Sequence, residues 1–328
     1  MTARRDFLKL ASSMAVTAAA GTVAGRAFAA AEKWPTRPIR LVVPYPAGGS
    51  SDIIARLISK QLGEALGQPV VVDNKPGANG NVGAALVAQA NDNHTVLLCD
   101  VGALAISPSV YTKLTFDPAK DLKGVSMLAY SPHMLVVHPS VQANTLKELV
   151  EMSKRGQMNF AVTAIGSAPH LAGVAVEQAT GAKWQYVPYK GGAQAIADTV
   201  GGTAQILMNG MLATLPHVQS GKLKAIAISK RTRMPLVGQL PTIAEQGVAN
   251  FESGTWQGVM APASMPDAMV TRLNAELIRV IRSPEVRSQL IGQGAEVATM
   301  TPAETARFFN TEKTRWAGVV KQAGIKLE

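Results

Sequence analysis

Four glycine-rich turns place backbone N–H groups where anion-binding chemistry can occur. Each turn follows a short apolar run and opens a stretch with helical periodicity; the turns are 46–52 (PAGGSSD), 76–83 (PGANGNVG), 164–170 (AIGSAPH) and 189–193 (YKGGA). The first turn of an α-helix leaves N–H groups without partners, and the helix dipole makes that end partly positive. Glycine lets a ligand approach because no Cβ blocks the backbone. The turns therefore predict binding of a carboxylate or phosphate.

The sequence argues against a nucleotide as the bound anion. Gly77, Gly80 and Gly83 lack the G-x-G-x-x-G spacing, and no Gly-Lys-Ser/Thr sequence ends a phosphate-binding loop. Glycines before helices are also routine turn chemistry, so one such turn alone does not indicate a site. The carboxyl ends of strands in an open α/β sheet gather at one edge, where ligands bind. Several turns of this kind therefore favour an anion held between them.

The sequence contains few candidate catalytic residues. There is no G-x-S-x-G elbow. Ser167 and His170 lie three residues apart at an expected helix start, but no carboxylate lies close enough in sequence to orient the histidine. We interpret His170 as a hydrogen-bonding residue at a helix end. Asp52 is interpreted as an acceptor of backbone amides in the first turn of a helix, with contact to a ligand amine as the alternative.

The spacing of the histidines in the sequence does not support a metal site. His133 and His138 are five residues apart, so on a strand they point to opposite faces, and His94 and His217 have no partner nearby in sequence. The single cysteine, Cys99, lies in an apolar run and is interpreted as a buried thiol. One cysteine excludes a disulfide framework. We expect no metal and no cofactor.

The elements that position these turns alternate along the chain. Short β-rich runs lie at 39–43, 70–72, 96–98, 134–137, 159–162, 204–208 and 223–228. Helical periodicity lies at 51–66, 146–154, 171–180, 193–200, 268–282, 284–293 and 302–323. This alternation is typical of α/β folds with parallel sheets. With 328 residues, 47% of them hydrophobic, the chain is long enough for about two folded domains.

The N-terminus predicts export. Arg4 and Arg5 precede an apolar region rich in small residues, and 27–29 (AFA) supplies a cleavage site. We expect 1–29 to be a signal peptide of the twin-arginine type, with the general secretory route as the alternative. No cysteine follows the apolar region, so we expect a soluble periplasmic protein and not a lipoprotein. The net charge of +10 comes from scattered lysines and arginines, and an exported protein rarely meets nucleic acid, so we expect no nucleic-acid partner.

Taken together, the motifs resemble the Bug-type extracytoplasmic solute receptors of the tripartite tricarboxylate transporter class. The matching stretches are 34–35, 38–49 with Asp52, 74–78 with Gly80 and Gly83, 166–167 with 170–173, 187–191, 240–242, 272–274 and 294–296. The resemblance implies an α/β, two-lobed periplasmic-binding-protein fold (type II, Venus flytrap), each lobe a mixed sheet flanked by helices. With chain crossings at 127–133 and 228–231, lobe 1 would comprise 30–130 plus 230–328, and lobe 2 would comprise 131–229.

The resemblance also implies a function and a site. In that family a small carboxylate lies between the lobes and is passed to membrane transporter subunits. The implied ligand-binding residues are Tyr45, Ala47, Gly48, Gly49, Asp52, Asp100 and Gly102 in the first lobe, and Ser167, His170, Tyr189, Lys190, Gly191 and Asn209 in the second. Gly77 joins them from the second glycine-rich turn. We expect a monomeric receptor and not an enzyme.

The sequence departs from the family pattern at several positions, including the turn at 165–167, and one departure bears on the ligand. Ala47 stands where a second proline is common, and Asp100 occupies a stretch that is often small and hydroxyl-bearing. An acidic group facing the cleft repels a second carboxylate, so Asp100 argues against a plain dicarboxylate and for an amino-acid-like, amide or aromatic ligand. Two other functions stay open: an exported hydrolase or isomerase that uses Ser167 and His170, and a ligand-sensing module for a membrane kinase.

Overall fold

The structure is a computed structural model that describes residues 34–327, so the predicted signal peptide lies outside the described residues. The strands are β1 (Ile39–Val43), β2 (Val70–Asn74), β3 (Thr95–Asp100), β4 (Leu122–Val137), β5 (Asn159–Val162), β6 (Gln185–Pro188), β7 (Ile206–Gly210), β8 (Lys224–Ile228), β9 (Gly254–Pro262) and β10 (Glu296–Val297). The helices are α2 (Ser50–Leu66), α3 (Asn81–Ala88), α4 (Ser107–Val110), α5 (Leu146–Arg155), α6 (Ala168–Thr180), α7 (Gly192–Val200), α8 (Met211–Gln219), α9 (Asp267–Ile281), α10 (Pro284–Gly292) and α11 (Pro302–Ala323). Short helical turns are η1 (Ala78–Gly80), η2 (Gly102–Ile106) and η3 (Pro235–Val237).

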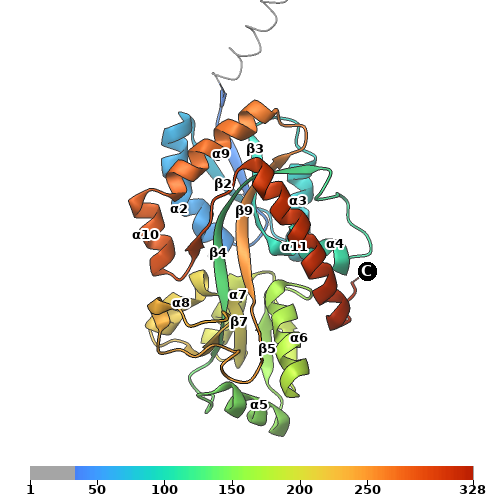
Figure 1. Cartoon of the computed structure of the whole chain (residues 1–328), viewed down its shortest axis with the longest axis vertical. Helices are drawn as coiled ribbons and strands as arrows, with labels where there is room; N and C mark the ends of the chain where they lie inside the picture. Colours follow the sequence, from blue (N-terminus) through green and yellow to red (C-terminus); the bar gives the residue numbers. More distant parts are fainter. Residues whose placement is uncertain (1–33, 328) are drawn as a thin grey trace, which may run out of the picture.

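The strands follow the order β2-β1-β3-β9-β4-β7-β5-β6, and β10 and β8 also pair with β4. Pairing is parallel within β1–β3 and within β5–β7, whereas β9 and β4 run antiparallel to their neighbours. Strand β4 pairs with β9 as far as Pro132 and with β7 from His133 onward. Figure 1 shows β4 and β9 running between the upper and lower halves of the molecule. Each lobe is therefore a mixed sheet, and β4 belongs to both.

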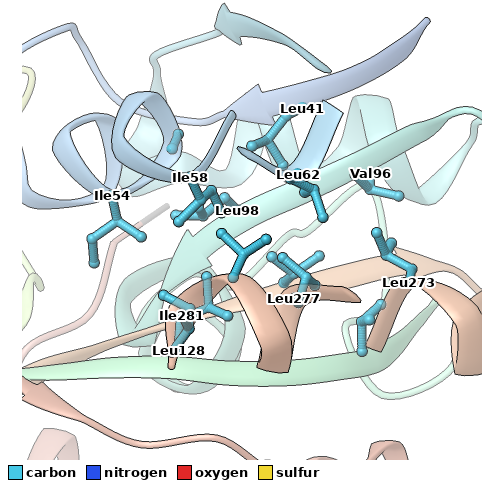
Figure 2. Close-up of a cluster of buried hydrophobic side chains, with 14 of the residues drawn as sticks. Leu41, Ile54, Ile58, Leu62, Val96, Leu98, Leu128, Leu273, Leu277 and Ile281 are labelled. Carbon is cyan, nitrogen blue, oxygen red and sulfur yellow. The ribbon is translucent and has the colours of Figure 1, made fainter. Parts of the chain in front are cut away.

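The core of the first lobe lies between its sheet and helices α2 and α9. Ile54, Ile58 and Leu62 repeat at helical spacing along α2, and all three are buried. In Figure 2 these side chains lie beside Leu98 of β3 and Leu277 of α9, with which they form one apolar cluster. This packing fixes the axis of α2 and therefore the position of its first turn.

A second apolar cluster fills the other lobe, and its membership bears on where the lobe ends. Ile243, Val248 and Phe251 pack in this cluster with Phe160 of β5. A lobe that ends at residue 229, as the sequence predicts, leaves these three residues in the first lobe. The Ser253 amide also donates to the Ser229 carbonyl oxygen at 3.0 Å. The packing therefore argues for a second crossing between Ser253 and Gly254, where β9 begins.

Several elements were not predicted from the sequence, among them β9, α8 and the greater part of β4. The strand pattern in β9 is broken by Gly254 and Gly258, and most of β4 escapes recognition because only its last residues form a continuous apolar run. Helix α8 contains Pro216, which is unfavourable inside a helix. Within residues 34–327, no helix has the length and apolar character needed to cross a membrane.

Candidate functional site

A cavity lies between the lobes, where β1, β3, β5, β6 and β7 end. It encloses about 520 Å³ of space free of protein atoms, part of it open to solvent. The lining residues are Tyr45, Gly49, Ser50, Ser51, Asn79, Asp100, Val101, Gly102, Thr163, Ser167, Ala168, Pro169, Gly191, Gly192, Asn209, Gly210, Thr255 and Gln257. Ligands bind at this edge of α/β sheets because the loops after the strands converge there.

Three helices begin at the cavity wall. Helix α2 starts after Gly49 and α7 after Gly191, and neither has a side-chain cap among the described residues. Helix α6 starts after Ser167, which also lines the cavity. Within residues 34–327, the first-turn N–H groups of α2 and α7 therefore lack a side-chain cap, and three helix dipoles present their positive ends. This arrangement favours a bound anion.

The carboxyl group of Asp100 occupies one corner of the cavity. Its Oδ1 atom accepts hydrogen bonds from the Tyr45 hydroxyl at 2.5 Å and from the Gly102 amide at 2.7 Å. Burial raises the pKa of Asp100 to about 6, although both hydrogen bonds act in the opposite direction. Burial and the neighbouring Asp100 also raise the pKa of Tyr45. The tyrosine is therefore a neutral donor at physiological pH.

Two buried amide side chains reach the same cavity without partners. Gln257 is fully buried, and neither its Oε1 nor its Nε2 atom has a hydrogen-bond partner within residues 34–327. The Nδ2 atom of Asn79, which is 9% exposed, also lacks one in that range. A buried polar atom without a partner costs about 1–3 kcal/mol, so these atoms indicate a place where a ligand or water completes the bonding.

Sequence reasoning missed both amides. Gln257 lies in the unpredicted strand β9, where a polar residue among Trp256, Val259 and Met260 was the available signal. Asn79 belongs to the second glycine-rich turn and has a left-handed backbone (φ 54°). That turn was predicted to approach a ligand through Gly77, but its asparagine is the residue that lines the cavity.

The predicted site residues divide into two groups. Those that line the cavity together are Tyr45, Gly49, Asp100, Gly102, Ser167, Gly191 and Asn209. Those that do not line it are Ala47, Gly48, Asp52, Gly77, His170, Tyr189 and Lys190.

The carboxylate of Asp52 stabilises the turn before α2 through hydrogen bonds. Its side chain is 3% exposed, and its Oδ2 atom accepts from the Gly48 amide and from Arg56, both at 2.9 Å. The other oxygen accepts from Asn74 at 3.0 Å. Burial raises the pKa of Asp52, but these hydrogen bonds and Arg56 outweigh it and hold the pKa below its usual value. The carboxylate thus acts as the predicted acceptor of a backbone amide.

Ser167 and His170 are bonded as helix-end residues. The Ser167 hydroxyl donates to the Ala164 carbonyl at 2.7 Å and accepts the His170 amide at 3.4 Å. The His170 Nδ1 atom accepts from the Gly166 amide at 3.0 Å. Burial lowers the pKa of His170 to about 4, so the ring is neutral. Because the serine proton points to a carbonyl and not to the imidazole, this geometry gives no activated nucleophile.

The remaining predicted residues do not line the cavity. Lys190 is exposed, and its amide donates to the Gln194 side chain. Tyr189 packs at the edge of an apolar cluster, and burial raises its pKa to about 12. Gly48 adopts φ 85° and Gly77 φ 146°, conformations that favour glycine, so both residues shape their turns.

The described residues offer few side chains for metal binding or for thiol chemistry. In the part of the chain from 34 to 327, no three His, Cys, Asp or Glu residues lie together as a metal site. Cys99 is fully buried, and burial raises the pKa of its thiol well above the usual value. The prediction of a buried thiol on a strand is confirmed.

Known proteins match this chain over most of its length. The tripartite tricarboxylate transporter family receptor matches residues 54–325. Protein BugT of Bordetella pertussis is 37% identical over 302 residues, which cover 91% of this chain and 93% of BugT. Because the match spans both lobes, it concerns the whole receptor and not one shared domain.

Solved structures agree with this match. A protein of R. palustris described with adipate superposes with a TM-score of 0.86 at 34% identity, covering 89% of this chain and 99% of that one. MatC of Rhodopseudomonas palustris, described with bound malate, gives a TM-score of 0.82 at 29% identity and covers 88% and 100%. The predicted α/β periplasmic-binding-protein fold and the predicted absence of enzyme function are thereby confirmed. The chain belongs to the tripartite tricarboxylate transporter receptor family, whose members are periplasmic solute-binding proteins.

Proposed function

We propose that this protein captures a small organic carboxylate between its lobes and presents it to the membrane subunits of a tripartite transporter. The observation that carries the proposal is the convergence of three helix starts on one cavity, two of them without side-chain caps. Backbone N–H groups at such ends bind carboxylates without an arginine. The adipate and malate of the two solved relatives support this ligand class.

Contacts across the cleft support capture by closure. A Cβ on Gly48 of the first lobe would lie 3.4 Å from the Cβ of Ala193 in α7. A Cβ on Gly191 would lie 2.7 Å from Cδ of Pro46. The lobes therefore touch at the cavity mouth, as expected of a closed form. A ligand favours this form only to the extent that it binds the closed shape more tightly than the open one.

Export delivers the protein to the place where this function operates. Residues 1–29 serve as a signal peptide, and Arg4-Arg5 with Phe7, Leu8 and Lys9 direct the precursor to the twin-arginine route. The mature chain then acts in the periplasm as a monomer that is not lipid-anchored. The family's periplasmic function supports export itself, and the twin-arginine route rests on the sequence alone.

A thermal-shift screen of the purified mature protein tests the function. Monocarboxylates, dicarboxylates and aromatic carboxylates are compared with their uncharged amides, for example benzoate with benzamide. A true ligand at about 100 times its Kd adds about 2.7 kcal/mol to the free energy of unfolding. We expect at least one carboxylate to raise the Tm while its fully uncharged analogue does not. A flat screen, with no carboxylate retained in native mass spectrometry, contradicts the proposal.

A further inference from the structure

We infer that the cavity has a second recognition point, formed by Tyr45, Asn79, Asp100 and Gln257, that selects a carboxamide on the ligand. The preferred solute is then a monocarboxylate with a primary amide at its other end, and not a plain dicarboxylate. This inference rests on the proposed function, because it takes the capture of one carboxylate at the helix starts as given. The four residues are called the polar corner below.

The polar corner is assembled from three segments far apart in the chain. Asp100 of β3 is the direct antiparallel partner of Gln257 of β9, so their side chains share one face of the sheet. A Cβ placed on Gly102 would lie 3.0 Å from Oδ1 of Asp100, 3.1 Å from Oδ1 of Asn79 and 3.1 Å from the Tyr45 hydroxyl. These polar atoms therefore converge around Gly102, where only a glycine leaves them room.

The hydrogen-bonding capacity left over in the polar corner identifies the ligand group. Oδ1 of Asp100 already accepts two hydrogen bonds, from Tyr45 and from Gly102. Within the described chain, Gln257 keeps an acceptor and a donor without partners, and Asn79 keeps a donor. A matching group must therefore both donate and accept hydrogen bonds.

A carboxamide meets both requirements without adding charge. A second carboxylate could accept from Asn79 and Gln257 but would face the acceptor oxygen of Gln257 and the Asp100 carboxyl. Two carboxylates sharing a site cannot both ionise freely. An ammonium group would bond the acceptors but leave the two amide donors buried without partners. Leaving buried donors unpaired is costly, which is how a polar site rejects a mismatched ligand.

Matched pairs of ligands test the inference by isothermal titration calorimetry at pH 7.5. The pairs are succinate with succinamate and adipate with its monoamide, so that each differs only in carboxylate against carboxamide; 4-aminobutyrate and butyrate complete the set. We expect a monoamide to bind at least about tenfold more tightly than its dicarboxylate. Asp100→Asn, which keeps an acceptor for Tyr45 and Gly102, should shift this ratio toward the dicarboxylate by about tenfold.

The control variant is Asp267→Asn, which removes an exposed carboxylate outside the cavity and should leave the ratio unchanged. If the dicarboxylates bind as tightly as the monoamides and Asp100→Asn does not move the ratio, the inference is wrong while the proposed function stands. If 4-aminobutyrate binds best, a cationic donor is preferred and the carboxamide is likewise excluded. If no carboxylate binds in this set or in the wider screen, the proposed function itself fails.

Discussion

Two effects act on the protonation of Asp100 in opposite directions. Its carboxyl anchors the Tyr45 hydroxyl and the Gly102 amide, which favour the ionised form, yet its burial between lobes favours the protonated form. Burial dominates, so the pKa rises from its ordinary value of 3.8 to about 6. A receptor that needed only a backbone grip on one carboxylate gains nothing from this acid. Its position is better explained by a role in choosing among ligands.

This pKa predicts how stability changes with pH. Between about pH 4 and pH 6 the folded protein holds the Asp100 proton and the unfolded chain does not, so the stability from this group is lost as the pH rises. Asn at position 100 cannot titrate. We therefore expect the Tm difference between Asp100→Asn and wild type, measured without ligand, to shift in favour of the variant from pH 4 to pH 7. Above pH 7 this difference should stay constant. A Tm difference that is constant over pH 4–7 would contradict this pKa.

At the residue scale, the sequence predicted part of the site: Asp100 and Asn209 line the cavity as expected, whereas Asn79 and Gln257 were not predicted. Asp52 was interpreted from its place at a helix start, and Asp100 was implied by the family resemblance; the structure places Asp100 at the cavity and Asp52 in the turn. Gln257 could not be found in the same way. Its importance comes from pairing with Asp100, and that register depends on a tertiary contact which no local pattern encodes.

At the scale of elements, the first turn of α2 is the best-defined part of the proposed anion site. The turn is held from behind by Asp52, which accepts the Gly48 amide, and by the packing of Ile54 and Ile58 in the core. Gly49 itself has an ordinary extended backbone (φ −82°), so glycine is not required there for conformation. Its small size is therefore available for ligand access.

Gly49→Val should separate binding from folding. The nearest atom to a Cβ at this position is the Pro46 carbonyl oxygen at 3.8 Å, so the side chain fits the fold but crowds the amides at the cavity. We expect carboxylate affinity to fall by about tenfold or more, worth about 1.4 kcal/mol, with little change in Tm. The matched control is Gly156→Val, also extended (φ −160°) and with no atom within 4 Å among the described residues. Equal losses of affinity and Tm in Gly49→Val would make this glycine purely structural.

The elements predicted from local patterns are those whose own residues carry a clear apolar periodicity. Strand β1 matches the expected run at 39–43, and α2 with its amphipathic spacing begins within one residue of the prediction. Strand β9 was missed because Gly254, Gly258 and Pro262 weaken its pattern, although its residues are buried between β3 and β4. Tertiary pairing stabilises that strand, so its own sequence says little.

At the scale of the whole molecule, the contacts between lobes decide which shape holds a ligand. Ala193 of α7 faces Gly48 across the cleft mouth, and Pro46 lies against Gly191. Away from the mouth, Leu212 of α8 packs in the core of the first lobe. Ala168 and Leu171 of α6 likewise pack in a cluster with Trp316 of α11. The lobes are thus in contact at the mouth and also share apolar packing away from it.

Ala193→Trp should hold the mouth open. The large ring cannot fit beside Gly48 in the closed form, but in the open form it can point into solvent. We expect a carboxylate ligand to bind at least about tenfold more weakly, and small-angle scattering to show a larger radius of gyration with ligand than for wild type. Ala275→Trp, at an exposed position of α9, is the control and should behave as wild type. Unchanged affinity in Ala193→Trp would contradict closure at this contact.

The register between β3 and β9 also has a consequence for biosynthesis. Asp100 and Gln257 are direct partners, yet roughly 150 residues of chain separate them, and the ribosome makes β9 late. Until then a nascent chain carries β3 with one edge unpaired, and unpaired edges adhere to other strands. The first lobe therefore cannot complete its sheet before the second lobe has been synthesised. A polypeptide that stops short of residue 254 would leave one edge of β3 unpaired and prone to aggregation in the cytosol.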